Sequence, residues 1–150
     1  MTVLVRDTGF APDDWRTGYV PLAALADRPD SEGPVGADLS SPALSQHDWQ
    51  RLCALLPHLG LVRIRLRDFG DVAAFDVARA IRAQGYDGRL RAHGAVLARL
   101  YTMTRRAGFD EVELDRRQAR MQPAEHWRNE PGWHPAPRRR GAGDLGTSAR

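Results

Sequence analysis

The sequence predicts an α/β domain with a parallel sheet of successive βα units, arranged like half of an eight-stranded barrel. Segments 61–67, 89–93 and 111–114 alternate apolar and charged residues, and segments with helical spacing separate them. Strands joined through helices pair in parallel. Because side chains alternate along a strand, these segments predict one apolar sheet face and one charged face. Parallel sheets usually have two apolar faces, so the charged face requires an explanation.

Local signals place the other elements. Ser45 can cap a helix, and Gly85 and Gly108 can end two others. The expected strands outside the central stretch are 3–5 and 18–21, which would form an N-terminal hairpin, and 35–40. The expected helices are 22–26, 45–59, 72–84, 95–107 and 115–121.

The amino-acid composition of the chain changes near residue 122. Residues 1–122 are predicted to form a single α/β domain, which is an ordinary size for one hydrophobic core. Residues 123–150 are rich in proline, arginine and glycine, a composition typical of a mostly disordered tail. Trp127 and Trp133 are the tail residues that we expect to contact the domain.

Composition excludes several classes of protein. No segment approaches the roughly 20 apolar residues of a membrane span, and no signal peptide is visible, so a cytoplasmic protein without membrane contact is expected. Cys53 is the single cysteine, which excludes an internal disulfide and a multi-cysteine metal site. Neither a cofactor motif nor metal-ligand spacing occurs, so no cofactor and no metal is expected. The basic tail lacks interleaved aromatic residues, so nucleic-acid binding is not expected.

The charged face of the predicted sheet is the first candidate site. Its members are Arg63, Arg65, Arg89, Arg91, Glu111 and Glu113. Arginine suits sulfate, phosphate or carboxylate, so this face can be an anion-binding surface. Opposite charges on adjacent strands also pair with one another. We therefore favour a salt-bridge lattice, solvated or closed by a partner such as a second copy of the chain.

The carboxyl ends of the strands are the second candidate site, because ligands of α/β sheets bind there. His93 ends one strand, and Asp71 precedes the helix expected at 72–84. Histidine titrates near neutral pH, so His93 and Asp71 are the candidate catalytic residues. A histidine at a strand end can equally be structural, and the sequence shows no recognisable partners for a catalytic triad.

Two runs of residues carry a resemblance to a known family. The first is Phe75–Gly94, with Gly85-Tyr-Asp-Gly-Arg-Leu-Arg-Ala as its most specific part, and the second is Met103–Asp110, which ends in Gly-Phe-Asp. Asp14-Trp15 and Gly33-Pro-Val-Gly36 extend the similarity, which covers roughly residues 14–114. The chain resembles a small bacterial family of unknown function whose members are described as oxidoreductases involved in sulfite reduction.

The resemblance implies that the protein takes part in sulfate assimilation together with the enzymes of sulfite reduction. Family members carry Asp-Gly-Arg-Gly-Tyr-Ser where this chain has Asp71-Val-Ala-Ala-Phe-Asp76. Polar groups of the family are therefore missing at the start of the helix expected at 72–84. The first expectation is an accessory protein of assimilatory sulfite reduction that binds partners or self-associates without catalysis. The alternative is an oxidoreductase or oxyanion-binding enzyme that uses His93, Asp71 and the arginines on sulfite or a related anion.

Overall fold

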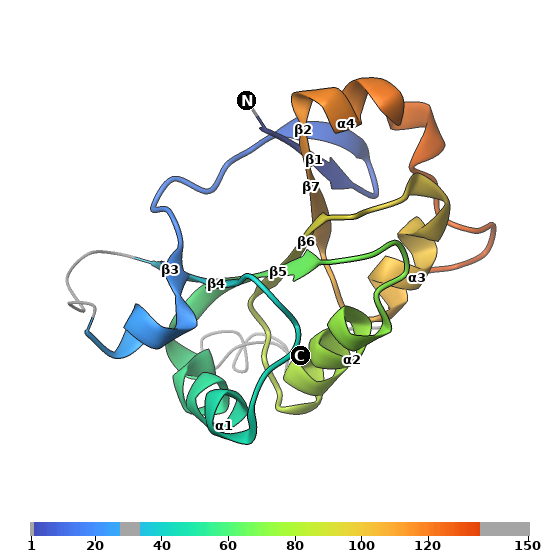
Figure 1. The fold of residues 1–150 in the computed structure, drawn as a ribbon. Helices are drawn as coiled ribbons and strands as arrows, with labels where there is room; N and C mark the ends of the chain where they lie inside the picture. The colour runs from blue at the N-terminus through green and yellow to red at the C-terminus, as the bar shows by residue number, and fades with distance from the viewer. Residues whose placement is uncertain (1, 28–33, 136–150) are drawn as a thin grey trace, which may run out of the picture.

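The computed structural model describes residues 2–27 and 34–135 (Figure 1). Within these residues one seven-stranded sheet has the order β2-β1-β7-β6-β5-β4-β3. The strands are β1 (Thr2–Arg6), β2 (Gly9–Pro12), β3 (Val20–Pro21), β4 (Val35–Leu39), β5 (Leu59–Leu66), β6 (Arg89–Gly94) and β7 (Glu111–Asp115). The α-helices are α1 (Gln46–Leu55), α2 (Val72–Ala83), α3 (Tyr101–Arg106) and α4 (Arg116–Met121). Short 3₁₀ turns are η1 (Leu22–Asp27), η3 (Leu56–His58), η4 (Ala98–Leu100) and η5 (Ala124–His126).

The sheet is mostly parallel. Strands β3 to β7 are neighbours in chain order, and each pair among them is parallel. Helix α1 connects β4 to β5, α2 connects β5 to β6, and η4 with α3 connects β6 to β7. The predicted α/β class and the parallel βα units are therefore confirmed. The sheet also has an antiparallel part, because β1 pairs antiparallel with both β2 and β7.

The prediction of the N-terminal hairpin is correct for its first strand and wrong for its second. Strand β1 pairs with β2, and Asp7 and Thr8 form the turn between them. The segment expected to close the hairpin forms β3 instead, at the opposite edge of the sheet beside β4. Gly9 has a φ of 119°, which suits a tight reversal directly after β1. The chain therefore turns directly after β1, and not in a longer loop between the strands predicted at 3–5 and 18–21.

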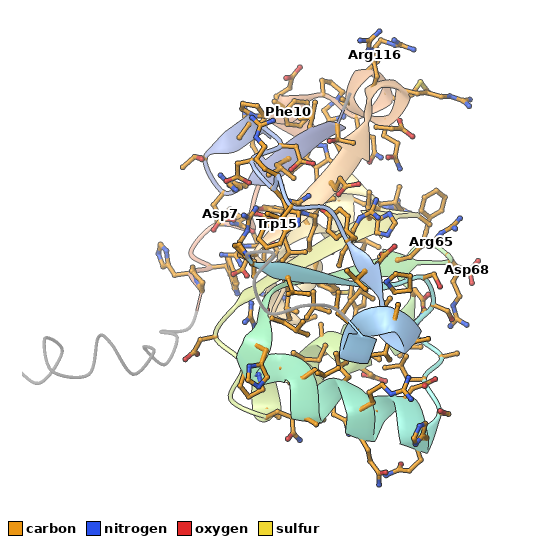
Figure 2. All side chains as sticks on the ribbon, turned by 90° about the vertical axis from the view of Figure 1, so that its left-hand side faces the viewer. Asp7, Phe10, Trp15, Arg65, Asp68 and Arg116 are labelled. Carbon is orange, nitrogen blue, oxygen red and sulfur yellow. The ribbon has the colours of Figure 1, made fainter. Side chains whose placement is uncertain are left out.

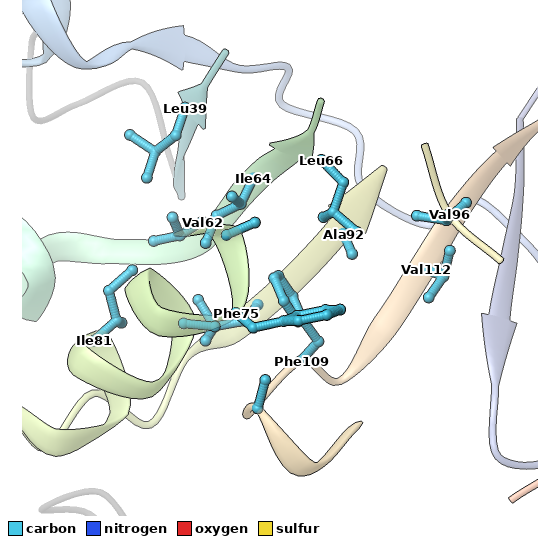
Figure 3. Packing of buried hydrophobic residues seen from close by; sticks show 14 of the residues in the cluster. Leu39, Val62, Ile64, Leu66, Phe75, Ile81, Ala92, Val96, Phe109 and Val112 are labelled. Carbon is cyan, nitrogen blue, oxygen red and sulfur yellow. The ribbon is translucent and has the colours of Figure 1, made fainter. Parts of the chain in front are cut away.

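Helices α1, α2 and α3 pack on one face of the sheet (Figures 1 and 3). Alternate residues of β5 and β6 enter this core, including Val62, Ile64 and Leu90, all fully buried. Phe75 of α2 meets Phe109, two residues before β7, edge to face with ring centroids 6.4 Å apart. The apolar face of the predicted sheet is thus covered by the helices that connect its strands.

The third predicted helix begins later than expected. Gly94 has a φ of 92°, and the backbone N–H of Ala95 donates to the carbonyl of Leu66. A Cβ atom at position 94 would lie 2.6 Å from that carbonyl oxygen, so only glycine fits. The side chain of Gln122 then bonds both Val96 and Ala98. These contacts hold the start of the segment in an extended conformation, and helical structure begins at η4.

Residues 123–135 pack against the body of the protein. Trp127, expected to contact the domain, is buried and meets Tyr101 edge to face at 6.0 Å. Asn129 bonds Thr102, and Trp133 lies beside Arg105. The rest of the predicted tail, residues 136–150, lies outside the described residues. Among the described helices, none combines the length and apolar character that a bilayer crossing requires.

Candidate functional site

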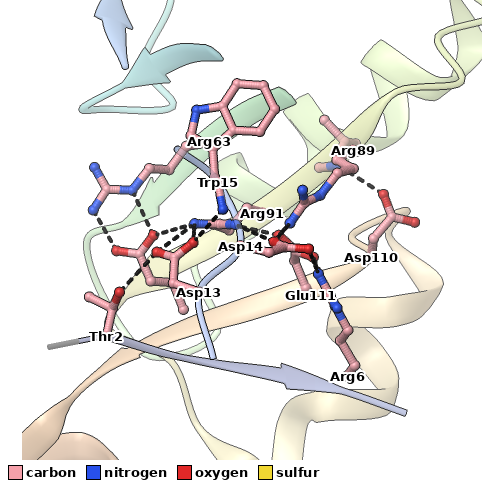
Figure 4. A network of polar contacts seen from close by, with 12 residues as sticks. Thr2, Arg6, Asp13, Asp14, Trp15, Arg63, Arg89, Arg91, Asp110 and Glu111 are labelled. Atoms are coloured by element: carbon pink, nitrogen blue, oxygen red, sulfur yellow. Dashed lines mark hydrogen bonds and ion pairs between the residues drawn. The ribbon is translucent and has the colours of Figure 1, made fainter. Parts of the chain in front are cut away.

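Residues 13–19, here called the strap, lie over the charged face of the sheet (Figure 4). Their path follows from the topology, because β2 is at one edge of the sheet and β3 is at the other. The chain must cross the sheet between them, and the helices occupy the opposite face. The strap contributes Asp13, Asp14, Trp15 and Tyr19 to the charged face.

Arg91 of β6 is the centre of the contacts beneath the strap. Its side chain is completely buried. Its Nε donates to Glu111 at 2.7 Å, and one terminal nitrogen donates to Glu113 at 3.0 Å. The same nitrogen donates to both carboxylate oxygens of Asp13 at 3.2 Å and to the hydroxyl of Tyr19. Arg91 therefore ties two strands of the sheet to the strap.

Further pairs extend this arrangement into a cluster of four arginines and four carboxylates. Arg63 donates to Glu113 at 2.6 Å across the face. Arg89 joins Glu111 and Asp14 at 2.7 Å each. The charged cluster consists of Arg6, Arg63, Arg89, Arg91, Asp13, Asp14, Glu111 and Glu113. Five of the six residues predicted for the charged face form ion pairs with one another, and Arg65 has none among the described residues. The strap of the same chain covers the centre of this cluster.

Hydrogen bonds and nearby arginines lower the pKa values of Asp13, Asp14 and Glu113. Burial favours the neutral acid, but hydrogen bonds from Arg6 and Arg89 outweigh it and hold the pKa of Asp14 at about 2. Burial is likewise outweighed at Glu113 by the hydrogen bond and charge of Arg63, so its pKa lies below the ordinary value. At Asp13 the amide of Trp15 and the side chain of Thr2 also lower the pKa against burial.

Two glycines of the sheet make room for the strap. A Cβ atom at Gly36 would lie 3.0 Å from the indole nitrogen of Trp15, and one at Gly60 would lie 3.1 Å from the same ring. The indole N–H donates to the carbonyl of Gly18 at 2.6 Å. Asp14-Trp15 and Gly36, which the sequence resemblance grouped without a physical reason, are therefore in contact with each other.

His93 and Arg65 form the rim of the charged face, at the carboxyl ends of β5 and β6. They are register partners on adjacent parallel strands. Burial, reinforced by the charges of Arg63 and Arg65, lowers the pKa of His93 to about 4. The Nε2 atom of His93 is buried and has no hydrogen-bond partner among the described residues. Arg65 is exposed, and within residues 2–27 and 34–135 it has no ion pair.

Asp71 and His93, the two candidate catalytic residues, have different surroundings. Asp71 is the N-cap of α2 and accepts from the amide of Ala74. It also accepts from the backbone and side chain of Arg67. Burial raises the pKa of Asp71, but these hydrogen bonds outweigh it and the net pKa is lowered. The contacts of Asp71 thus serve the start of α2, and they do not include His93.

The two runs that carry the sequence resemblance are joined by Arg82 of α2. Its guanidinium donates to the carbonyls of Tyr86 and Gly88 and to the carboxylate of Asp110. Tyr86 reaches the carbonyl of Leu59, and a Cβ atom at Gly88 would collide with its ring. The Gly85–Gly88 motif and the Gly-Phe-Asp motif therefore hold α2 and the strands in place.

A family model described as "Bacterial protein of unknown function (DUF934)" matches residues 43–130. This chain belongs to the DUF934 family. The expected membership in a bacterial family of unknown function is confirmed at that level. No curated protein matches this DUF934 chain, and neither does a solved structure. The match covers α1 to η5, whereas the hairpin and the strap precede it.

Sequence reasoning found the sheet members of the charged cluster but missed its strap members. Asp13 and Asp14 had the appearance of turn residues, and Tyr19 that of a strand residue. The excess of four arginines over two glutamates on the predicted charged face was the signal that acidic residues were needed from elsewhere. No group of three or more His, Cys, Asp or Glu side chains suited to a metal ion occurs among the described residues.

Arg91 and Arg65 give a matched test of the buried cluster. Replacing Arg91 by Met removes the buried guanidinium that Glu111 and Glu113 share and leaves them with Arg89 and Arg63 at the edge of the cluster. The free energy of unfolding should therefore fall by about 3–5 kcal/mol. Arg65→Met, on the neighbouring strand but exposed, should change it by less than about 0.5 kcal/mol. Urea unfolding measures both. Equal effects of the two variants would contradict the assignment of Arg91 as the structural centre.

His93 predicts a pH dependence of stability. Its folded-state pKa of about 4 lies below the ordinary 6.5, so the unfolded chain binds the proton first as pH falls. This contribution to stability is complete above pH 6.5 and is lost towards pH 4, by about 3 kcal/mol in total. Urea unfolding at several pH values should show a flatter profile for His93→Gln. The exposed His58→Gln should retain the slope of the unmodified protein, and a slope unchanged in His93→Gln would refute the prediction.

Proposed function

We propose that this DUF934 protein is a non-catalytic accessory protein of assimilatory sulfite reduction, acting by partner binding or self-association. One observation carries the non-catalytic part of the proposal. Asp13, Asp14 and Glu113 of the charged cluster have lowered pKa values, and His93 has a pKa of about 4. General acids and bases work best when their pKa is near the operating pH. These groups are thus better suited to structure and recognition than to proton transfer, and the sequence resemblance supplies the pathway.

We propose that the partner docks at the start of α2. Phe69 is 66% exposed and Val72 is 68% exposed, which is unusual for large apolar side chains. Arg65 and Asp68 project at the same edge of the molecule (Figure 2). Aromatic residues and arginine are enriched where proteins bind one another. We call Arg65, Asp68, Phe69 and Val72 the Phe69 patch.

The chemistry of the patch specifies its partner. Phe69 and Val72 require an apolar pocket on the partner. Arg65 has no ion pair among the described residues, so a carboxylate beside that pocket would complement it. The charged cluster around Arg91 is not part of this contact, because the strap covers it. The proposed partner is an enzyme of sulfite reduction that presents an acidic rim around an apolar pocket.

Binding of the purified protein to sulfite reductase and the other sulfate-assimilation enzymes tests this proposal. Calorimetry should detect a complex with one of these enzymes, and Phe69→Ser should weaken it at least tenfold, because anchoring aromatic residues dominate such contacts. Met121→Ser is the control, because Met121 is 70% exposed on α4. A stable monomer at micromolar concentration with no affinity for any of these enzymes would overturn the proposal.

The second candidate function is oxyanion binding, either alone or as part of an enzyme acting on sulfite. It is favoured by the buried, unpartnered Nε2 of His93 next to the unpaired Arg65. An oxyanion between them would accept hydrogen bonds from the guanidinium and from a protonated imidazole. Such an anion would also favour the protonated form of His93 and oppose the lowering of its pKa by burial.

Thermal unfolding in sulfite, sulfate or chloride at equal ionic strength tests oxyanion binding. A specific anion at a hundred times its Kd should raise the melting temperature by roughly 5–10 °C. Arg65→Ala and His93→Gln should each remove the rise. Arg116→Ala should keep it, because Arg116 is an exposed arginine of α4 that lies away from Arg65 (Figure 2). Equal melting temperatures in all three salts would exclude this function.

A further inference from the structure

A cavity of about 660 Å³ lies where α2 and α3 end, and its lining includes no residue of the charged cluster or of the Phe69 patch. The two helices lie on the same face of the sheet (Figure 1). Ligand sites for small organic molecules have volumes in this range. The cavity is lined by Arg79, Arg82, Ala83, Gly85, Tyr86, Asp87, Arg105, Arg106, Ala107, Gly108, Trp133, His134 and Pro135.

Two of the four arginines form the fixed part of the wall. Arg82 donates to the carbonyls of Tyr86, Gly88 and Gly108, which follow the ends of the helices. Arg105 donates to the carbonyl of Phe109 and to Asp7. Helix carboxyl ends carry partial negative charge that disfavours anions. Arg82 and Arg105 offset that charge with contacts the fold itself provides.

The other two arginines are held loosely. Arg79 pairs with Asp76 at 3.1 Å, and Arg106 pairs with Glu130 at 2.9 Å. Both acids are more than 60% exposed, so these pairs contribute little and exchange readily. A phosphate in the cavity offers a guanidinium more charge and better geometry than an exposed carboxylate. Arg79 and Arg106 are therefore available to a ligand.

Trp133 supplies a different kind of contact. It is partly exposed, lines the cavity, and lies with its ring 5.4 Å from the guanidinium carbon of Arg105. Indole faces stack on planar ring systems such as nucleobases, and arginine strengthens such stacks. One wall of the cavity thus favours an aromatic ring, and the exposed arginines favour an anionic group.

We propose that this cavity binds a nucleotide, with its phosphates on Arg79 and Arg106 and its base on Trp133. The volume admits a molecule of that size. The inference does not depend on the proposed function, because it uses none of the residues of the Phe69 patch or the rim.

Calorimetric titration of the full chain with ADP, adenosine and inorganic phosphate tests the site. ADP should bind at least tenfold more tightly than either fragment. The double variant Arg79→Gln/Arg106→Gln should weaken ADP at least tenfold and leave adenosine unchanged. Trp133→Leu should weaken ADP and adenosine but not phosphate. Arg116→Gln, on the exposed surface of α4, is the control and should bind ADP normally.

Several results would overturn the proposal. Absence of ADP binding to the unmodified chain would do so, as would ADP affinity that survives both the double arginine variant and Trp133→Leu. Phosphate binding as tight as that of ADP would exclude the nucleotide class. Circular dichroism confirms that each variant is folded. Arg82 is left unchanged because its hydrogen bonds hold the motifs of the fold together.

Discussion

The structure depends on the neutralisation of one buried guanidinium. Arg91 is fully buried at the centre of the sheet, where an isolated charge costs several kcal/mol. Glu111 and Glu113 supply two negative charges from the adjacent strand, but both of them are also buried. Asp13 of the strap brings a further carboxylate, and Arg63 from β5 a further guanidinium. The sheet and the strap therefore stabilise each other, and neither would keep this conformation without the other.

The same constraint explains a charged face on a mostly parallel sheet. Parallel sheets are normally covered by helices on both sides, which requires apolar residues on both faces. Here the second cover is an irregular segment whose side chains are mainly polar. The antiparallel β1–β2 hairpin at one edge makes this possible, because the chain must return across the sheet to reach β3. Trp15 lies over Gly36 and Gly60 and adds an apolar contact between the strap and the sheet.

The sequence was sufficient to predict the elements whose signals are local. Alternation in β5 to β7, the Ser45 cap of α1 and the span of α2 could all be read directly, because each depends on neighbouring residues. The partner of β1 and the contacts of Asp13 and Asp14 could not, because they depend on where the chain lies after folding. The late start of α3 was missed because the carbonyl of Leu66, which holds Ala95, belongs to a different strand.

Charge engaged in the fold is not available for recognition, and this separates the arginines into two groups. Arg82 and Arg91 donate hydrogen bonds to carbonyls or carboxylates of the chain itself, so their replacement would act first on stability. Arg65 is exposed and has no described ion pair, whereas Arg79 and Arg106 pair with acids that are largely in solvent. A ligand or partner can displace water or a weak pair from these three at little cost. Function in this DUF934 protein should therefore be sought at the rim and at the helix ends, and not at the more densely charged centre of the sheet.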